Sequence, residues 1–198
     1  MRILVYGAGV LGCELAHVLL QNKKNDVTLL ARGEWKERID QKGLVIRQWA
    51  QRKTTVDRVR TIDVLAPEDF YDLVFVVLQA GQLPDVLPVL KANRSPYFVF
   101  VGNDPHAKQV LEAMQRPADK VAFGFQNTAG RRKMDAMVLA MAKTPLGRLC
   151  ASDHAMHAVK EMQYLDEAFE ALRKQAGTAM PMWEKLRNEM PAWNTLQK

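Results

Sequence analysis

The sequence predicts an α/β protein built on a doubly wound, mainly parallel sheet. Short apolar runs that contain β-branched residues alternate along the chain with segments of helical period. Such runs are typical of parallel strands that helices bury on both faces. The first run is followed by three glycines in the spacing G-x-G-x-x-G. This spacing, between a strand and a helix, is typical of the dinucleotide-binding turn of a Rossmann-type fold.

The first predicted unit comprises a strand over residues 3–6, a helix that begins near Val10, and a second strand over residues 27–30. A polar stretch separates the helix from the second strand. The apolar residues at helical spacing, which we expect to face inward, are Leu11, Leu15, Val18 and Leu19. The first helix would direct unpaired backbone N–H groups toward the space over the glycines, and these groups suit a phosphate.

The predicted cofactor site combines the glycine turn with an arginine. Gly7 allows a tight turn, Gly9 lets the backbone approach a pyrophosphate, and Gly12 lets helix and strand pack closely. The predicted cofactor-binding turn consists of Gly7, Ala8, Gly9, Val10, Leu11 and Gly12. Arg32 ends the second strand, where an NAD-specific site usually has an acid, and a guanidinium suits a 2′-phosphate. We therefore expect NADP(H) rather than NAD(H), the alternative for Arg32 being an ordinary exposed loop arginine.

Residues 43–60 alternate apolar and polar side chains and predict short strands of an antiparallel excursion, with Leu44, Ile46 and Trp49 inward. The other predicted elements are strands over residues 73–78, 98–101 and 120–127, helices near 84–92 and 106–114, and a hairpin within 134–150. Ligands of open α/β sheets lie outside the carboxyl ends of the strands. We therefore expect polar residues after the later strands on one rim with the glycines and Arg32, namely Gln79, Asn103 and Asp104.

The C-terminal part, residues 154–198, has a helical period and is rich in Met, Glu, Lys and Gln. Leu165, Phe169 and Leu172 would form one apolar stripe of a helix, and Gly177 would cap its C-terminus. The last apolar residues are Met180, Met182, Trp183, Met190 and Trp193. Exposed apolar side chains of this kind favour association with another chain. We therefore expect a homo-oligomer that associates through this C-terminal tail.

Composition indicates a folded globular chain of 198 residues, 48% of them hydrophobic and 25% charged. Its apolar stretches are too short for a membrane span and its start lacks the pattern of a secretory signal, so we expect a cytoplasmic protein that does not bind membranes. Cys13 and Cys150 lack metal or redox spacing, and Cys13 is expected to pack as a small hydrophobe. The net charge of +6 is spread among acids, which favours small anionic ligands over nucleic acid. His154 and His157 are not taken as metal ligands.

The order of motifs resembles the ketopantoate reductases (2-dehydropantoate 2-reductases) over about residues 1–150. The stretches that carry the resemblance are "RILVYGAGVLGCELAHVLL", "DVTLLARG", "GLVIR", "DLVFVVLQAGQ", "FVFVGND", "FGFQNTAGRR" and "TPLGRL". It implies a Rossmann NADP-binding domain over residues 1–152 and, over residues 153–198, the truncated start of the family's helical substrate domain. It also implies that NADPH delivers a hydride to a 2-oxo acid, as in pantothenate biosynthesis.

The resemblance assigns roles to individual residues. It implies that the three glycines hold the pyrophosphate, Arg32 the 2′-phosphate and Asn103 the nicotinamide side of the cofactor, with Asn103 and Asn127 near the substrate. Two positions depart from the family's pattern. Gln79 stands where a lysine is common and is still expected at the cofactor, and Asp104 stands where a glycine follows the asparagine. Both changes disfavour a phosphate-rich or anionic ligand.

The family's catalytic lysine lies two residues after a tryptophan in a helix. Trp193 fits that tryptophan by its position along the chain but has Thr195 two residues later, whereas Trp183 is followed by Lys185 at the right local spacing. Lys185 and Lys198 are the candidates to protonate the developing alkoxide, the alternative for each being a solvent-exposed helix lysine. Two functions stay open: a 2-oxo acid reductase, or a catalytically incomplete NADP-binding or interaction protein without the substrate domain. The chain would be a truncated product or a natural short relative.

Overall fold

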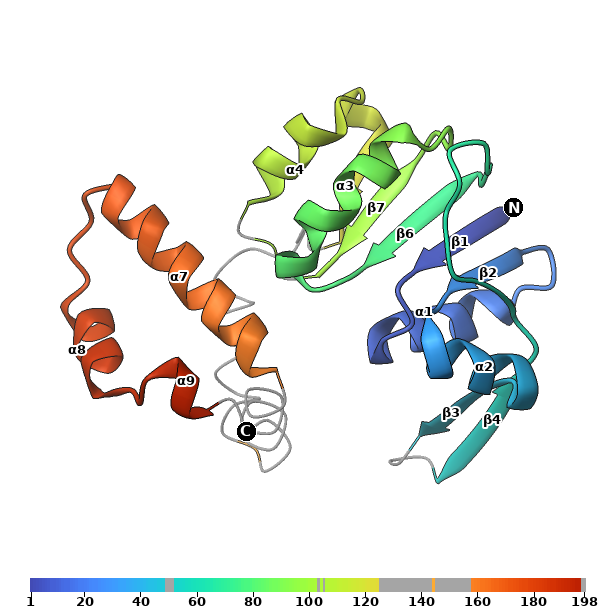
Figure 1. Ribbon diagram of the computed structural model, residues 1–198, viewed down its shortest axis with the longest axis horizontal. Coiled ribbons are helices and arrows are strands. Elements are labelled where there is room, and N and C mark those ends of the chain that lie inside the picture. Colours follow the sequence, from blue (N-terminus) through green and yellow to red (C-terminus); the bar gives the residue numbers. More distant parts are fainter. Residues whose placement is uncertain (49–51, 103, 105, 125–143, 145–157, 197–198) are drawn as a thin grey trace. The chain divides into compact units, whose positions relative to one another are not determined.

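The computed structural model describes residues 1–48, 52–102, 104, 106–124, 144 and 158–196 (Figure 1). The chain divides into two compact units, Met1–Phe125 and Gln126–Lys198. The boundary predicted between residues 152 and 153 falls outside the described residues and stays a prediction. The predicted hairpin within residues 134–150 and the predicted strand end at 126–127 also lie outside them, apart from the single residue Thr144.

A parallel sheet forms the centre of the first unit. Within the described residues it has six strands in the order β5-β2-β1-β6-β7-β8, each paired in parallel with its neighbours. The strands are β1 Arg2–Tyr6, β2 Asp26–Leu30, β5 Arg60–Ile62, β6 Leu73–Val77, β7 Phe98–Val101 and β8 Val121–Phe123. The chain adds β2 and β5 on one side of β1 and then β6, β7 and β8 on the other. The winding therefore reverses between β1 and β6, and the predicted fold class is confirmed.

Helices cover both faces of this sheet (Figure 1). Successive strand residues point to opposite faces, so Leu4 joins the core under α3 and α4 while Val5 joins the core under α1 and α2. The helices of the first unit are α1 Val10–Leu20, α2 Gly33–Lys42, α3 Leu83–Ala92 and α4 Ala107–Met114, with short 3-10 turns η1 Ala80–Gln82 and η2 Ala118–Lys120. Of these elements, α2 and β5 are absent from the sequence analysis. The first is strongly polar, with Ile39 its buried residue, and the second is very short.

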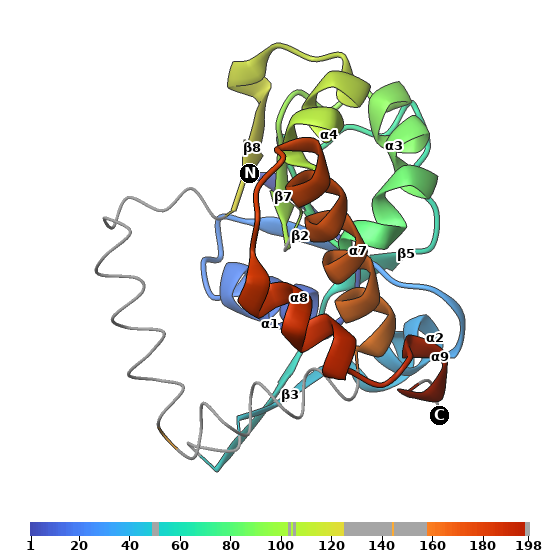
Figure 2. The same cartoon turned by 90° about the vertical axis from the view of Figure 1, so that its left-hand side faces the viewer.

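An antiparallel hairpin of β3 Leu44–Gln48 and β4 Lys53–Asp57 stands apart from the main sheet and packs beside α1 and α2 (Figures 1 and 2). This confirms the predicted excursion. Leu44 is buried as expected, while Trp49 lies outside the described residues. Nδ1 of His17 on α1 lies 2.5 Å from Oδ2 of Asp57, and this contact joins the hairpin to α1.

The buried face of α1 differs from the predicted one. Leu11 and Val18, expected to face inward, are 65% and 56% exposed. The buried residues of this helix are Gly12, Cys13, Ala16 and His17. The reason is the close approach of α1 to the end of β1, where a Cβ at Gly12 would lie 1.8 Å from the carbonyl oxygen of Gly7. Small side chains must face inward at such a contact, and the leucine and valine turn outward.

The described part of the second unit consists of α7 Val159–Gln175, α8 Pro181–Glu189 and α9 Trp193–Leu196. Gly177 follows α7 with a φ of +60°, in agreement with its predicted place at the helix end. Leu165, Phe169 and Leu172 lie on one side of α7 as predicted, but Phe169 and Leu172 are about two-fifths exposed. Instead α7 buries Asp166 and Glu170, because side chains of α8 pair with these carboxylates.

Within the described ranges, every helix is either too short or too polar to cross a bilayer.

Candidate functional site

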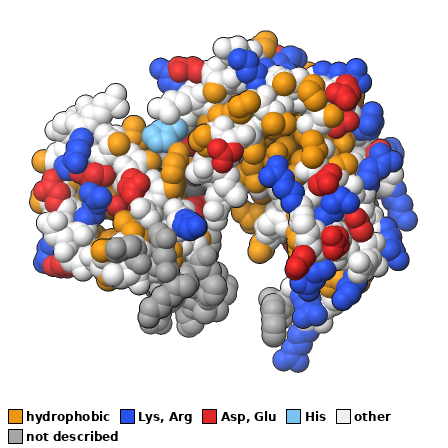
Figure 3. Space-filling view, viewed as in Figure 1, with side chains coloured by type: hydrophobic (Ala, Val, Ile, Leu, Met, Phe, Trp, Pro, Cys, Tyr) orange, Lys and Arg blue, Asp and Glu red, His pale blue; other side chains and the backbone are white. Residues whose placement is uncertain are grey.

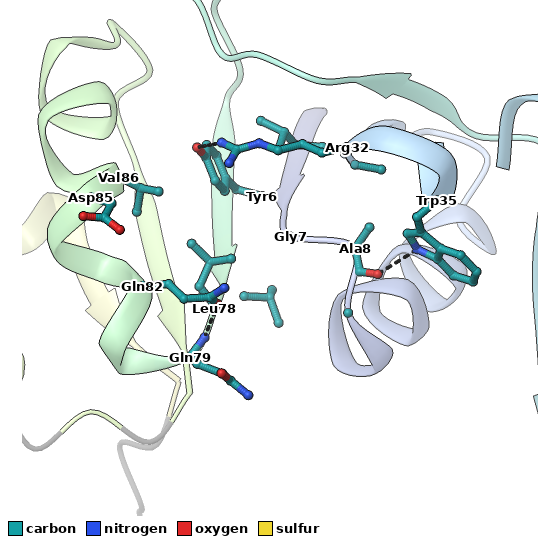
Figure 4. A pocket seen from close by; sticks show the side chains of 14 residues that line it. Tyr6, Gly7, Ala8, Arg32, Trp35, Leu78, Gln79, Gln82, Asp85 and Val86 are labelled. Atoms are coloured by element: carbon teal, nitrogen blue, oxygen red, sulfur yellow. Dashed lines mark hydrogen bonds between the residues drawn. The ribbon is translucent and has the colours of Figure 1, made fainter. Parts of the chain in front are cut away.

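A cavity of about 530 Å³ opens at the carboxyl end of the sheet, where the winding reverses between β1 and β6 (Figure 4). Its walls come from the turn after β1, from the end of β2 with the first turn of α2, and from the segment that joins β6 to α3. The lining residues are Tyr6, Gly7, Ala8, Gly9, Leu30, Ala31, Arg32, Trp35, Val77, Leu78, Gln79, Gln82, Asp85 and Val86. Doubly wound sheets bind ligands at this reversal, and the volume is typical of small-molecule sites.

The three glycines meet three different requirements. Gly7 has a φ of +121°, and a Cβ there would lie 2.3 Å from the carbonyl oxygen of Val77. A Cβ at Gly12 would collide with the Gly7 carbonyl, whereas a Cβ at Gly9 would have no atom within 4 Å. The first and third glycines therefore allow close backbone packing, and the second leaves open space in front of the turn. That open space, at the N-terminus of α1, fits a pyrophosphate.

Val10 and Leu11 occupy the first turn of α1 and are 88% and 65% exposed. The first backbone N–H groups of a helix have no partner within the helix. Of the predicted cofactor-binding turn, Gly7, Ala8 and Gly9 line the cavity, whereas Gly12 is buried behind them. The contact of this turn with a cofactor stays a prediction.

Arg32 immediately precedes α2 and, among the described residues that line the cavity, is the only cation. Its Nη2 donates a hydrogen bond to Oη of Tyr6 at 3.1 Å, which holds the guanidinium over the end of β1 (Figure 4). A guanidinium has five N–H donors, so this bond leaves others that can fork onto phosphate oxygens. The sequence analysis missed Tyr6, although its position as the last residue of β1 places it on the predicted rim.

Trp35 extends from the first turn of α2 to the glycine turn (Figure 4). Its Nε1 donates to the carbonyl oxygen of Ala8 at 2.9 Å, and the Sγ of Cys13 donates to the same oxygen at 3.3 Å. Burial raises the pKa of the Cys13 thiol, which confirms the expectation that Cys13 packs as a small hydrophobe. Sequence reasoning missed Trp35 because it did not predict α2.

The opposite wall carries Gln79 and Gln82, which cap η1 reciprocally. The backbone N–H of Gln79 donates to Oε1 of Gln82 at 3.2 Å, and the Gln79 side chain accepts from the backbone of Gln82. Asp85, on the first turn of α3, is the only carboxylate among the lining residues within the described part of the chain. Gln79 therefore lies on the predicted rim. Gln82 lies in a short 3-10 turn that no apolar pattern indicates, and Asp85 lies in the helix predicted near residues 84–92.

Asp104 lies beyond the end of β7 but lines a different, much smaller hollow, together with Leu78 and Gly102. Its Oδ1 accepts the backbone N–H of His106 at 2.8 Å. Its Oδ2 is buried and has no hydrogen-bond partner in the part of the chain that the structure describes. The carboxylate thus begins the turn that leads into α4 and does not face the main cavity.

Lys185, a predicted catalytic residue, lies on α8 with its side chain 66% exposed, and its Nζ is 3.9 Å from Oε1 of Glu189. The other predicted substrate and catalytic residues, Asn103, Asn127 and Lys198, fall outside the described residues. Their roles stay predictions. Across the described ranges no cluster of His, Cys, Asp and Glu is arranged to hold a metal, and His154 and His157 lie outside those ranges.

Lys and Arg side chains also gather over the β3–β4 hairpin (Figure 3). A second hollow there is lined by Arg47, Gln48, Arg52, Lys53 and Thr54. The three basic residues are exposed, and the hollow adjoins residues outside the described ranges. Exposed basic side chains of this kind are ordinary on a solvated surface, and we assign no site to them.

The fold is an α/β domain of Rossmann type, with its cavity at the point where the winding of the sheet reverses. The family model "Ketopantoate reductase PanE/ApbA" matches residues 3–149, and the chain belongs to this family of oxidoreductases. The resemblance drawn from the motifs is thereby confirmed. No curated protein matches the sequence.

Solved structures share the fold. One is D-mandelate dehydrogenase in a ternary complex with NADH and anilino(oxo)acetate, with 22% identity and a TM-score of 0.55 over 63% of this chain and 40% of that one. Another is 2-dehydropantoate 2-reductase from Geobacter metallireducens GS-15, with 23% identity and a TM-score of 0.50 over 61% of this chain and 40% of that one. The match therefore spans about two-fifths of the length of each of these two proteins.

Proposed function

We propose that this protein is an NADPH-dependent oxidoreductase of the ketopantoate reductase type, which reduces a 2-oxo acid to a 2-hydroxy acid. The observation that carries the proposal is one cavity that combines the open space in front of Gly9 with the guanidinium of Arg32. Membership of the family supports a nicotinamide cofactor, and the cation at the end of β2 supports its 2′-phosphorylated form.

The cavity suits the adenosine half of NADPH. The pyrophosphate would approach Gly9 and the first turn of α1, and the 2′-phosphate would approach Arg32. Asp85 places one carboxylate in the same cavity, and Gln79 supplies an amide where a lysine is common in the family. We therefore expect the protein to bind NADPH more tightly than NADH. The ratio of the two affinities should be smaller than in a site that has two cations.

The reaction requires a hydride, a proton and a seat for the substrate carboxylate. Bound nicotinamide supplies the hydride to the carbonyl carbon, and the balance is 2-oxo acid, NADPH and one proton to 2-hydroxy acid and NADP⁺. Lys185 or Lys198 would donate the proton to the carbonyl oxygen, and the amides of Asn103 and Asn127 would orient the cofactor and substrate. These four roles rest on the resemblance of the motifs.

The wider setting is proposed on the same basis. Residues 1–152 would form the cofactor domain and residues 153–198 the beginning of the substrate domain, in a cytoplasmic enzyme of pantothenate biosynthesis. The C-terminal helices expose Met182, Leu186 and Met190 at 71%, 54% and 40%, which supports self-association through this tail.

A second candidate is an NADP-binding or interaction protein that has no catalytic activity. It is favoured by the exposure of Lys185, which is paired with Glu189, and by the use of Gln79 as a cap. Both candidates require cofactor binding, so turnover separates them.

The test is a titration of the purified chain with NADPH and NADH, followed by nicotinamide fluorescence, with Arg32→Ala in parallel. We expect tighter binding of NADPH, and a loss of about tenfold to hundredfold in Arg32→Ala because charged hydrogen bonds are removed. NADPH oxidation with ketopantoate and other branched 2-oxo acids then favours the reductase. Binding without oxidation favours the second candidate, and absence of binding contradicts both.

A further inference from the structure

The position of the Trp35 side chain is determined mainly by polar contacts, because much of the side chain is exposed. Its side chain is 43% exposed, its indole N–H donates to the Ala8 carbonyl at 2.9 Å, and the guanidinium of Arg38 lies 5.5 Å from the ring centroid. A large aromatic side chain left this exposed gains less from the hydrophobic effect than one in a core. The hydrogen bond to Ala8 therefore determines where the indole lies, and equally where the Ala8 carbonyl points.

The direction of that carbonyl determines the direction of the next N–H. A trans peptide is planar, so the C=O of Ala8 and the N–H of Gly9 point in opposite directions, and no peptide bond in the described residues is cis. In Figure 4 the Ala8 carbonyl turns toward Trp35 and away from Leu78 and Gln82 on the opposite wall. The Gly9 N–H therefore turns toward the cavity side of the glycine turn, where the space in front of Gly9 is open.

The second donor to Ala8 is weaker. Cys13 donates from its thiol at 3.3 Å, and a thiol is a poor hydrogen-bond donor compared with an indole N–H. If the indole N–H were removed, the Ala8 peptide would be held by this weaker contact and could rotate. Rotation would withdraw an N–H from the cavity and present a carbonyl oxygen there, which repels phosphate oxygens.

We propose that Trp35 is a positioning residue that holds the Ala8–Gly9 peptide in the orientation that binds a diphosphate. The inference rests on the proposed function and extends it, because it places one determinant of diphosphate binding on α2, outside the glycine motif. Within the same cavity the 2′-phosphate depends on Arg32 and the diphosphate on Trp35, so the two parts of the ligand can be tested separately.

The test measures three ligands by isothermal titration calorimetry on the full chain. ADP carries a diphosphate without a 2′-phosphate, adenosine 2′-monophosphate carries a 2′-phosphate without any 5′-phosphate, and NADPH carries both groups. Trp35→Phe keeps an aromatic ring and removes the indole N–H. We expect it to weaken the binding of ADP and NADPH by about threefold to tenfold, the value of one hydrogen bond, and to change the affinity for the 2′-monophosphate by less than about twofold. Arg32→Ala is expected to weaken the binding of the 2′-monophosphate and NADPH and to leave the affinity for ADP unchanged.

Trp183→Phe is the matched control, because it removes an indole N–H that donates to Oε2 of Glu170 at 3.1 Å in the second unit. It is expected to leave all three affinities unchanged. Thermal unfolding of each variant separates positioning from folding. Equal weakening of all three ligands by Trp35→Phe, or no weakening of ADP, would overturn the inference while NADPH binding by the unaltered chain upholds the proposed function. Failure of the unaltered chain to bind any of the three ligands would overturn both.

Discussion

The two compact units of this chain are held together by different interactions. In the first unit, two apolar clusters fill the space between the sheet and its helices, with Leu4 and Val5 fully buried on opposite faces. In the second, Ala168 is the only buried hydrophobic residue among those described, and the buried side chains of α7 are otherwise Asp166 and Glu170. The first unit is therefore stabilised mainly by burial of apolar side chains, and the second mainly by ion pairs.

The charged cluster of the second unit joins α7 to α8. Arg187 contacts Asp166 at 3.0 Å, and Glu170 accepts from Arg173 at 2.9 Å and from Nε1 of Trp183 at 3.1 Å. The ring of Trp183 also meets Phe169 edge-on, with 4.7 Å between centroids. A cluster of this kind fixes the angle between helices while contributing little hydrophobic free energy. The cavity is accordingly built on the rigid unit, whose strand ends position its walls.

The largest expected effect tests the apolar unit. Leu4→Ala removes a side chain that is 0% exposed in the centre of the sheet, and we expect it to lower the free energy of unfolding by about 3–5 kcal/mol. Leu172→Ala, at a position 40% exposed on α7, is the control and should change it by less than about 1 kcal/mol. Denaturant titration measures both. If both variants lowered the free energy of unfolding equally, the two units would not differ in their dependence on apolar burial.

A smaller effect is expected from glycine substitutions within the first unit. Gly12→Ala should cost about 1–3 kcal/mol of stability, because the new methyl group meets the Gly7 carbonyl and the backbone must shift. Gly9→Ala places its methyl group in open space and should leave the melting temperature nearly unchanged. The same change should weaken the binding of NADPH by more than about tenfold. If Gly9→Ala bound NADPH normally, the assignment of the open space to the pyrophosphate would be wrong.

The charged cluster is tested by Glu170→Gln. This change keeps the size of the side chain and removes the carboxylate that Arg173, Trp183 and Arg187 share. We expect loss of helical circular dichroism on heating to begin at a lower temperature, while the melting of the sheet unit is unchanged. High salt should change the difference between the variant and the unaltered chain only slightly, since salt screens the buried pair of Arg173 and Glu170 much less than an exposed one. If Glu170→Gln lowered the melting temperature of both units equally, the separation of the two units would be contradicted.

The smallest effect is a dependence on pH. The hydrogen bond from Arg173, helped by Trp183 and Arg187, lowers the pKa of Glu170 from its ordinary 4.5 to about 2. Because the folded value is the lower one, the ionised carboxylate stabilises the helices above pH 4.5, and this contribution is lost as the pH falls from 4.5 toward about 2. An acid titration of the helical signal should show this loss in the unaltered chain, and Glu170→Gln should lack it.

Local patterns were sufficient to predict much of the fold. The buried strands at 3–6, 27–30, 73–78 and 98–101 are short apolar runs that contain β-branched residues, and their shortness and this content favour a strand over a buried helix. The antiparallel excursion was predicted from alternation for the same reason. Elements without such a pattern were missed, as polar α2 shows.

Contacts between distant residues could not be predicted in this way. Nothing near Trp35 in the sequence indicates that its indole reaches Ala8, and nothing near Tyr6 indicates its bond to Arg32. Phe169 and Leu172 stay exposed on α7 because Arg187 and Trp183 of α8 pair with the carboxylates of α7, which are buried instead.

The sequence by itself determined the parallel sheet, the glycine turn and the place of Arg32, because each depends on neighbouring residues and on strand or helix periodicity. Only the tertiary structure decided which face of α1 is buried, how Trp35 and Gln82 complete the cavity walls, and which carboxylates the second unit encloses. The reason is that the burial and the hydrogen bonds of a side chain depend on residues that are distant in the sequence. The complete fold determines which of these residues lie next to it.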